Sequence, residues 1–238
     1  MLDIVRAARA LDPQIGPDYV VIGHSQGGHA ALFAAALAPD WTPDLRLRGD
    51  VAMAPASHIA ATVLGMSKAA EPSYALGYAM YVLQSFTSNH PGIDLAAILT
   101  PEALSHLPET RTACISHTVS VGYWATAIPK DQFRAGADLS AVLKFAQANE
   151  PDALRIAGPV LVLQGTADDT VLPGWTDSVV RSLCAAGTAL TYSTYPGATH
   201  ESIVTQAASD VKAWIAGRFA GTPALANCQA LPSAGRSR

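Results

Sequence analysis

The sequence predicts an α/β fold, in which helices cover a parallel sheet and a long helical segment is inserted between two of the strands. Short apolar runs bounded by glycine or proline alternate with longer helix-forming stretches, and this alternation is typical of a parallel sheet. Between residues 57 and 157 helical patterns dominate and no clear strand pattern occurs. We therefore expect a core formed by residues 1–56 and 158–228, a helical insertion at 57–157, and a flexible tail at 229–238.

The predicted strands are short segments rich in Val, Leu, Ile, Thr or Tyr. They span residues 18–22, 47–53, 158–165 and 188–195. Helices are predicted at 1–10, 29–37, 174–186 and 202–219 in the core, and at 74–83 and 137–149 in the insertion. Because proline cannot donate the backbone hydrogen bond of a helix interior, Pro39 is expected to end the helix that precedes it.

The composition of the 238-residue chain is that of a globular protein. Half of the residues are apolar and the formal net charge is −4, so a full core can form and the basic stripe of a nucleic-acid-binding protein is missing. No apolar run reaches the roughly 18 to 20 residues of a membrane span. Cys114, Cys184 and Cys228 are too widely spaced for a zinc motif, and no nucleotide or flavin motif occurs. We expect no metal, no cofactor and no nucleic-acid partner.

The first residues of the chain have the spacing of a helix rather than the apolar core of a signal peptide. Leu2, Val5 and Ala8 recur on one helical face, whereas Asp3 and Arg6 interrupt any apolar run. The chain is therefore expected to begin inside a structural element, either because the natural product starts late or because an upstream piece has been removed.

The segment Gly23–Gly27, with His24 and Ser25 in the sequence G-H-S-Q-G, has the form of a nucleophile elbow. It follows a predicted strand and precedes a predicted helix, which is the context that this turn requires. The turn crowds the positions two before and two after the serine, so glycine is expected at both. The N–H of Gln26 would point at an oxyanion formed beside Ser25. The alternative is a glycine-rich turn that only packs a helix onto a strand.

A nucleophilic serine needs a base and a carboxylate that orients the base. Asp168 and Asp169 lie in the loop after the strand at 158–165, at the strand end where sites of parallel sheets form. We prefer Asp168 because it stands three residues after Gly165 and three before Val171; Asp169 is the alternative. The non-catalytic interpretation of either residue is a turn or a helix cap.

His200 is the predicted base. Of the 7 histidines it alone follows the last predicted strand in a loop, whereas His24 and His29 belong to the glycine-rich turn and its helix. The remaining histidines, at the edge of the insertion or within it, are His58, His90, His106 and His117. A single loop histidine is ordinarily a solvated surface residue, but the chain order Ser25, Asp168, His200 favours a catalytic role.

Taken together, these features resemble the secretory lipase family of α/β-hydrolases. The resemblance is carried by the G-H-S-Q-G-G-H-A-A segment, the Q-G-T-A-D-D loop, the long helical insertion and the terminal helix ending in W-I-A-G-R-F. It covers nearly the whole chain. It implies hydrolysis of carboxylic esters, including acylglycerols, through an acyl-serine intermediate with Ser25, Asp168 and His200 as the triad. The insertion would be the lid over the acyl-binding site.

The resemblance also implies covalent links and a location. Family members have a disulfide between the region after the acid-bearing strand and the C-terminal tail, which Cys184 and Cys228 would form. A second disulfide ties the lid to the N-terminal region, and Cys114 would supply the lid half. Family members are secreted. The expected partners are small-molecule or lipid esters, with transient contact between the lid and a lipid interface.

Relatives have several strands and a helix before the position of Met1, including the loop with the second oxyanion donor, so the chain resembles an N-terminally truncated member. The strand at 18–22 would then present an unpaired edge, which favours pairing with a second copy in a homodimer. An acyltransferase, a peptidase or a polyester hydrolase with the same triad is an alternative, as is an inactive fragment that acts only as a binding module.

Overall fold

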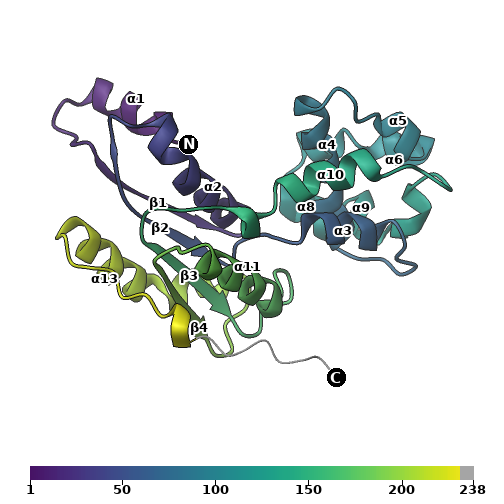
Figure 1. Cartoon of the computed structure of the whole chain (residues 1–238). Helices are drawn as coiled ribbons and strands as arrows, with labels where there is room; N and C mark the ends of the chain where they lie inside the picture. Colours follow the sequence, from purple (N-terminus) through teal and green to yellow (C-terminus); the bar gives the residue numbers. More distant parts are fainter. Residues whose placement is uncertain (231–238) are drawn as a thin grey trace. The chain divides into compact units, whose positions relative to one another are not determined.

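The computed structural model describes residues 1–230 (Figure 1). Packing divides the chain into two compact units. The first contains the residues up to Ser57 together with those from Pro151 onward, and the second is His58–Glu150. In the described part of the chain no helix is long and apolar enough to cross a membrane.

The first unit is built on a 4-stranded parallel sheet with the order β1-β2-β3-β4. The strands are β1 (Asp18–His24), β2 (Arg46–Met53), β3 (Val160–Gly165) and β4 (Leu190–Tyr195). Every residue of the inner strand β3 is buried, which explains its largely apolar composition. The predicted strands are therefore confirmed, with β1 and β4 at the two edges of this sheet.

Helices cover both faces of the sheet (Figure 1). On one face, α2 (Gln26–Trp41) and α11 (Pro173–Ala185) pack against the strands through Leu32, Val162 and Val180. Val5 of the N-terminal helix α1 (Asp3–Leu11) and Leu2, which directly precedes this helix, join a neighbouring cluster with residues of β1 and α2. The other face is covered by α12 (Ser202–Gln206) and α13 (Ala208–Phe219). Because all four strands are parallel, their carboxyl ends lie at one edge of the sheet, where the loops that follow them can meet.

Two details of the helix prediction are wrong. The predicted helix at 202–219 is two helices, separated at Ala207, although Ile203, Ala207 and Val211 remain in one buried cluster. Pro39 does not end its helix, because α2 continues to Trp41. A proline in the last turn removes the single hydrogen bond to the carbonyl four residues before it, and this local loss does not stop the helix.

The second unit is entirely helical apart from an isolated bridge between Leu99 and Phe133. Its helices and 3₁₀ turn are α3 (Ile59–Met66), α4 (Ala75–Asn89), α5 (Leu95–Ile98), α6 (Pro101–His106), α7 (Glu109–Thr112), α8 (Ile115–Ser120), α9 (Tyr123–Thr126), η1 (Pro129–Gln132) and α10 (Ser140–Ala148). Its core surrounds α4 and includes Trp124 and Met80. The Glu150 carboxylate accepts hydrogen bonds from the His58 and Ala60 N–H groups at 2.7 and 3.1 Å, which ties the two ends of the unit together.

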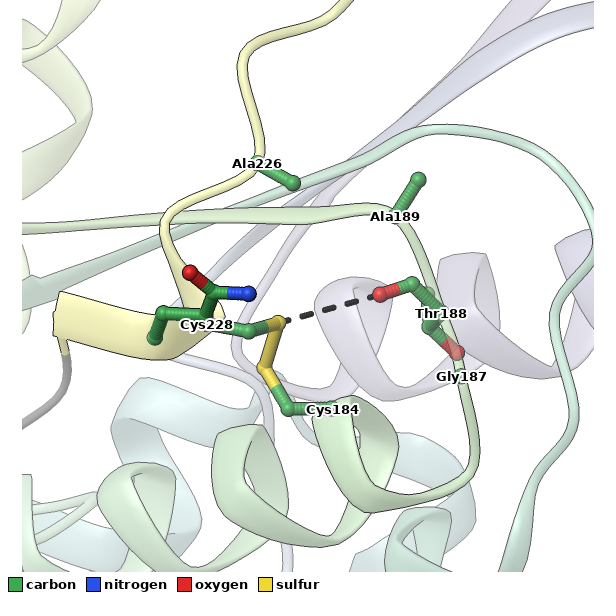
Figure 2. A pocket seen from close by; sticks show the side chains of 7 residues that line it. Cys184, Gly187, Thr188, Ala189, Ala226 and Cys228 are labelled. Carbon is green, nitrogen blue, oxygen red and sulfur yellow. Dashed lines mark hydrogen bonds between the residues drawn. A yellow bond between two sulfur atoms is a disulfide. The ribbon is translucent and has the colours of Figure 1, made fainter.

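The C-terminal segment runs along the outer edge of β4. Asn227 N–H donates to the Leu190 carbonyl at 3.0 Å, and the Asn227 amide bonds to both the N–H and the C=O of Tyr192. A disulfide joins Cys184 in α11 to Cys228, beside a surface hollow that Figure 2 shows. Of the tail predicted at 229–238, residues 229 and 230 belong to the 3₁₀ turn η3 (Cys228–Ala230), and the rest lies outside the described residues. Cys114 is a free, exposed thiol.

Candidate active site

Ser25 lies at the turn between β1 and α2 in an unusual backbone conformation. Its φ and ψ are 56° and −121°, a combination that costs a non-glycine residue about 1–3 kcal/mol and persists only where the surroundings impose it. The Ser25 N–H donates to the Met53 carbonyl at 2.9 Å, and the Ser25 carbonyl accepts from the N–H groups of His29 and Ala56, both at 3.0 Å. The ends of β1, β2 and α2 therefore hold this residue in place.

The glycines of the turn differ in their steric roles. A Cβ atom at Gly23 would lie 2.0 Å from the Gly27 carbonyl oxygen, so this position accepts only glycine. A Cβ at Gly28 would lie 3.0 Å from the Met53 carbonyl oxygen and 3.1 Å from the Pro55 Cα, whereas a Cβ at Gly27 would meet nothing within 4 Å. The expectation of crowding at Gly27 is therefore wrong for this chain, and the second crowded position is Gly28.

Gln26 is the first residue of α2. The N–H groups of a helix's first turn have no acceptor within the helix, and the helix dipole adds positive potential there. The position beside Ser25 is thus suited to a negative charge, with the Gln26 N–H as its candidate donor.

Asp168 lies in the loop after β3 with its carboxylate buried and fully hydrogen-bonded. Oδ1 accepts from the N–H groups of Val171 at 2.8 Å and Thr170 at 2.9 Å. Oδ2 accepts from His200 Nδ1–H at 2.8 Å and from Gln164 Nε2–H at 3.1 Å. The neighbouring Asp169 is exposed, so the geometry favours Asp168 as the partner of the histidine.

These contacts determine the charge of Asp168. Burial by itself would raise the pKa of the Asp168 carboxyl, but the hydrogen bonds from His200, Val171 and Thr170 outweigh it and lower the pKa below its ordinary value. The carboxyl is therefore ionised at neutral pH, as is required of a group that holds the Nδ1–H of an imidazole.

Gln164 is a site residue that the sequence reasoning missed. Its side chain is fully buried in β3. Its Nε2 donates to Asp168 and to the Val171 carbonyl, both at 3.1 Å, while its Oε1 accepts from the Thr176 hydroxyl at 2.6 Å. One feature of the sequence could have identified Gln164, namely a glutamine near the end of an otherwise apolar strand that is expected to be buried. A buried amide needs hydrogen-bond partners, so such a residue points to a local polar network.

The loop after β3 and the loop after β4 are joined through their backbones. Ala167 N–H donates to the Ala198 carbonyl at 2.9 Å, and Thr166 N–H donates to the Tyr195 carbonyl at 3.0 Å. A Cβ at Gly165 would lie 2.3 Å from the Ala198 oxygen, so glycine is needed there for the loops to approach. This contact brings Asp168 and His200 together.

His200 is buried, and two different residues hold it. Its Nδ1 bonds to Asp168, and its backbone carbonyl accepts from His24 Nε2–H at 2.8 Å. The rings of His24 and His200 lie 4.5 Å apart between centroids. The structure thus places His200 against the residue that precedes Ser25. Within residues 1–230 it shows no hydrogen bond between Ser25 Oγ and His200; such bonds often tighten only when substrate binds.

The other histidines do not join this group. His29 lies within α2, with its ring 4.7 Å from that of Phe33. Four more belong to the second unit: His58, His90, His106 and His117. No cluster of three or more potential metal ligands occurs among the described residues.

The parallel sheet with helices on both faces, the strained serine between strand and helix, and the aspartate–histidine pair on later loops define the class of the molecule as an α/β-hydrolase fold. The sequence model of the secretory lipase family matches residues 1–227, and the chain belongs to this family. A comparison with curated proteins found no match.

Solved structures support the same fold. Candida antarctica lipase A in its closed state matches with a TM-score of 0.78 at 20% identity, over 98% of this chain and 56% of that chain. A ligand-bound form of LipA from Xanthomonas oryzae, a rice cell wall degrading esterase, matches with a TM-score of 0.70 at 13% identity, over 92% of this chain and 62% of that one. The chain therefore spans less than two thirds of the length of these proteins.

Proposed function

We propose that the protein is a carboxylic ester hydrolase of the lipase or esterase type, with Ser25 as nucleophile, His200 as general base and Asp168 as the residue that orients the base. The observation that carries the proposal is the buried hydrogen bond of 2.8 Å between Asp168 and His200, formed beside the strained turn that presents Ser25. Family membership supports the reaction class, because the family is that of secretory lipases.

The proposed chemistry needs only these side chains, the ester and water. His200 Nε2 takes the Ser25 hydroxyl proton as Oγ attacks the ester carbonyl, and the carbonyl π electrons move onto its oxygen. The Gln26 N–H stabilises this oxyanion. The intermediate collapses to an acyl-serine and expels the alcohol, which receives the proton from His200. Water then repeats the sequence, releases the acid and regenerates Ser25.

The proposal also covers the helical unit, the substrates, the location and the assembly of the protein. The helical unit His58–Glu150 acts as a lid and contacts lipid interfaces transiently. The substrates are small-molecule or lipid esters, and the protein acts after secretion. A second copy of the chain pairs with the outer edge of β1, which has a neighbour on one side only in the described sheet.

The test is hydrolysis of p-nitrophenyl esters by the chain and by two serine variants. Ser25→Ala is expected to abolish turnover, while Ser209→Ala, at an exposed position of α13, is expected to leave it unchanged. Hydrolysis that persists in Ser25→Ala would refute the mechanism. A panel of short-chain, long-chain, peptide and polymer substrates separates ester hydrolysis from the other reactions that the same triad supports.

A further inference from the structure

We propose that His24 is a positioning residue for His200, whose backbone it holds against the strand that carries Ser25. The inference rests on the proposed function, because it assigns His24 a purpose only if His200 is the base. His24 is the last residue of β1 and the immediate neighbour of Ser25. It has no part in the chemical steps described above.

The contact between His24 and the His200 carbonyl determines which ring nitrogen of His24 carries the proton. A carbonyl oxygen can only accept, so the 2.8 Å bond to the His200 carbonyl requires that His24 Nε2 carries the proton. The imidazole ring of His24 also lies against that of His200, at 4.5 Å between centroids and with an angle of 45° between the planes. His24 therefore touches both the main chain and the ring of the same residue.

The bond between His24 and His200 matters because of the strands that it connects. Asp168 holds the His200 ring from the loop after β3, and β3 is separated from β1 by β2 in the sheet. That bond alone orients the imidazole but does not relate it to Ser25. The His24 bond links His200 to β1, one residue from the serine. This hydrogen bond to β1, the strand that leads into Ser25, thus sets the distance between His200 and Ser25.

The charge of His24 also suits this position. Burial and the charge of the His200 ring lower the pKa of His24, while the hydrogen bond to the His200 carbonyl and the carboxylates of Glu201 and Asp168 oppose this with smaller effects. His24 is therefore neutral at neutral pH. When His200 takes the serine proton and becomes an imidazolium, the ring in contact with it carries no charge that would repel it.

Two amide variants test the proposal. In His24→Gln the amide nitrogen is separated from Cα by the same number of bonds as Nε2 of histidine, so the bond to the His200 carbonyl can be kept. In His24→Asn the amide is one bond shorter and cannot reach. We expect His24→Gln to retain kcat within about threefold, and His24→Asn to lose about 10- to 100-fold in kcat with little change in KM.

A second measurement observes His200 directly and does not depend on turnover. In imidazole NMR spectra, the Nδ1–H signal of His200 is expected to be protected in the native chain and in His24→Gln, and to exchange faster with solvent in His24→Asn. Thermal melts of both variants accompany these spectra, because a purely structural role of the bond would lower the Tm of His24→Asn and leave its kcat and its His200 signal unchanged.

The outcomes separate the two proposals. If neither the native chain nor its variants hydrolyse esters, the proposed function fails, while the His200 signal still tests the tie to His24. If His24→Asn leaves both kcat and the His200 signal unchanged, or if the Gln and Asn variants lose activity equally, the positioning role of His24 is refuted.

Discussion

The Nδ1–H of His200 is bonded to the buried Asp168 carboxylate at 2.8 Å, which leaves Nε2 as the nitrogen able to accept a proton. This relationship fixes both the tautomer and the orientation of the imidazole. The remaining hydrogen bonds to Asp168, from Gln164, Thr170 and Val171, keep the carboxylate in place. The pair therefore has the form that a serine nucleophile requires of its base.

Replacing Asp168 by asparagine is expected to lower kcat by about 10⁴-fold, the scale of the loss for the same change in serine proteases, because an amide supports the wrong histidine tautomer. The measurement is steady-state ester hydrolysis. Asp169→Asn is the matched control and is expected to have little effect, since Asp169 is exposed. A larger loss in Asp169→Asn than in Asp168→Asn would reverse the assignment of the acid.

Asp50 in β2 is expected to destabilise the folded chain relative to the unfolded chain at neutral pH. Its side chain is fully buried, and among the described residues neither carboxylate oxygen has a hydrogen-bond partner. Burial raises the pKa of Asp50 well above 3.8. We predict that Asp50→Val stabilises the fold at pH 7 by about 1–3 kcal/mol, measured by denaturant unfolding.

The pH dependence of this effect follows from the sign of the pKa shift. Below pH 3.8 the Asp50 carboxyl is protonated in both the folded and the unfolded chain, so its ionisation does not reduce the free energy of unfolding. As the pH rises towards the folded-state pKa, only the unfolded chain ionises, and stability declines. The advantage of Asp50→Val should therefore grow from acidic to neutral pH; an advantage that is constant across this range would contradict the assignment.

Alanine at the two ends of the G-H-S-Q-G segment is expected to have opposite effects. Gly23→Ala places Cβ within 2.0 Å of a carbonyl oxygen and should destabilise the fold by about 1–3 kcal/mol or more. Gly27→Ala has open space around Cβ and lies in α2, where alanine is favoured by about 0.5–1 kcal/mol. Equal destabilisation of the two variants in thermal melts would refute this account of the turn.

The outer edge of β1 is expected to mediate a dimer. Ile22 is 48% exposed on a strand whose second edge has no partner in the described sheet, and such edges favour pairing between chains. Light scattering should show a mass that rises with concentration, and Ile22→Lys should keep the chain monomeric. A monodisperse monomer with a cooperative melt across the whole concentration range would refute the dimer.

The sequence predicted those parts of the site for which a local motif and the order of residues along the chain point to the same place. Strand ends in a parallel sheet lie at one edge, so the order of Ser25, Asp168 and His200 could identify loops that meet there. Contacts made only by tertiary packing could not be predicted in this way. The His24 bond to the His200 backbone joins residues 176 positions apart in the chain. The Gln164 bonds reach only the loop and helix that follow its strand, but they depend on how that loop folds back, which no periodicity or motif encodes.

Tertiary packing also explains why the predictions for Gly27, for Pro39 and for the helix at 202–219 were wrong in detail. Whether Gly27 or Gly28 is crowded depends on where Met53 and Pro55 pass the turn, which the G-H-S-Q-G pattern does not state. The break at Ala207 occurs without glycine or proline, the usual local signals. Pro39 lies in the last turn of α2, where its missing N–H matters least.

Labelling by a fluorophosphonate probe, with the modified residue mapped by mass spectrometry, tests the central claim most directly. Only a serine activated by an assembled histidine reacts quickly with such a probe. We predict fast, stoichiometric labelling of the native chain at Ser25, with the rate reduced in Asp168→Asn and the label lost in Ser25→Ala. No labelling of the native chain, or labelling at another serine, would contradict the account.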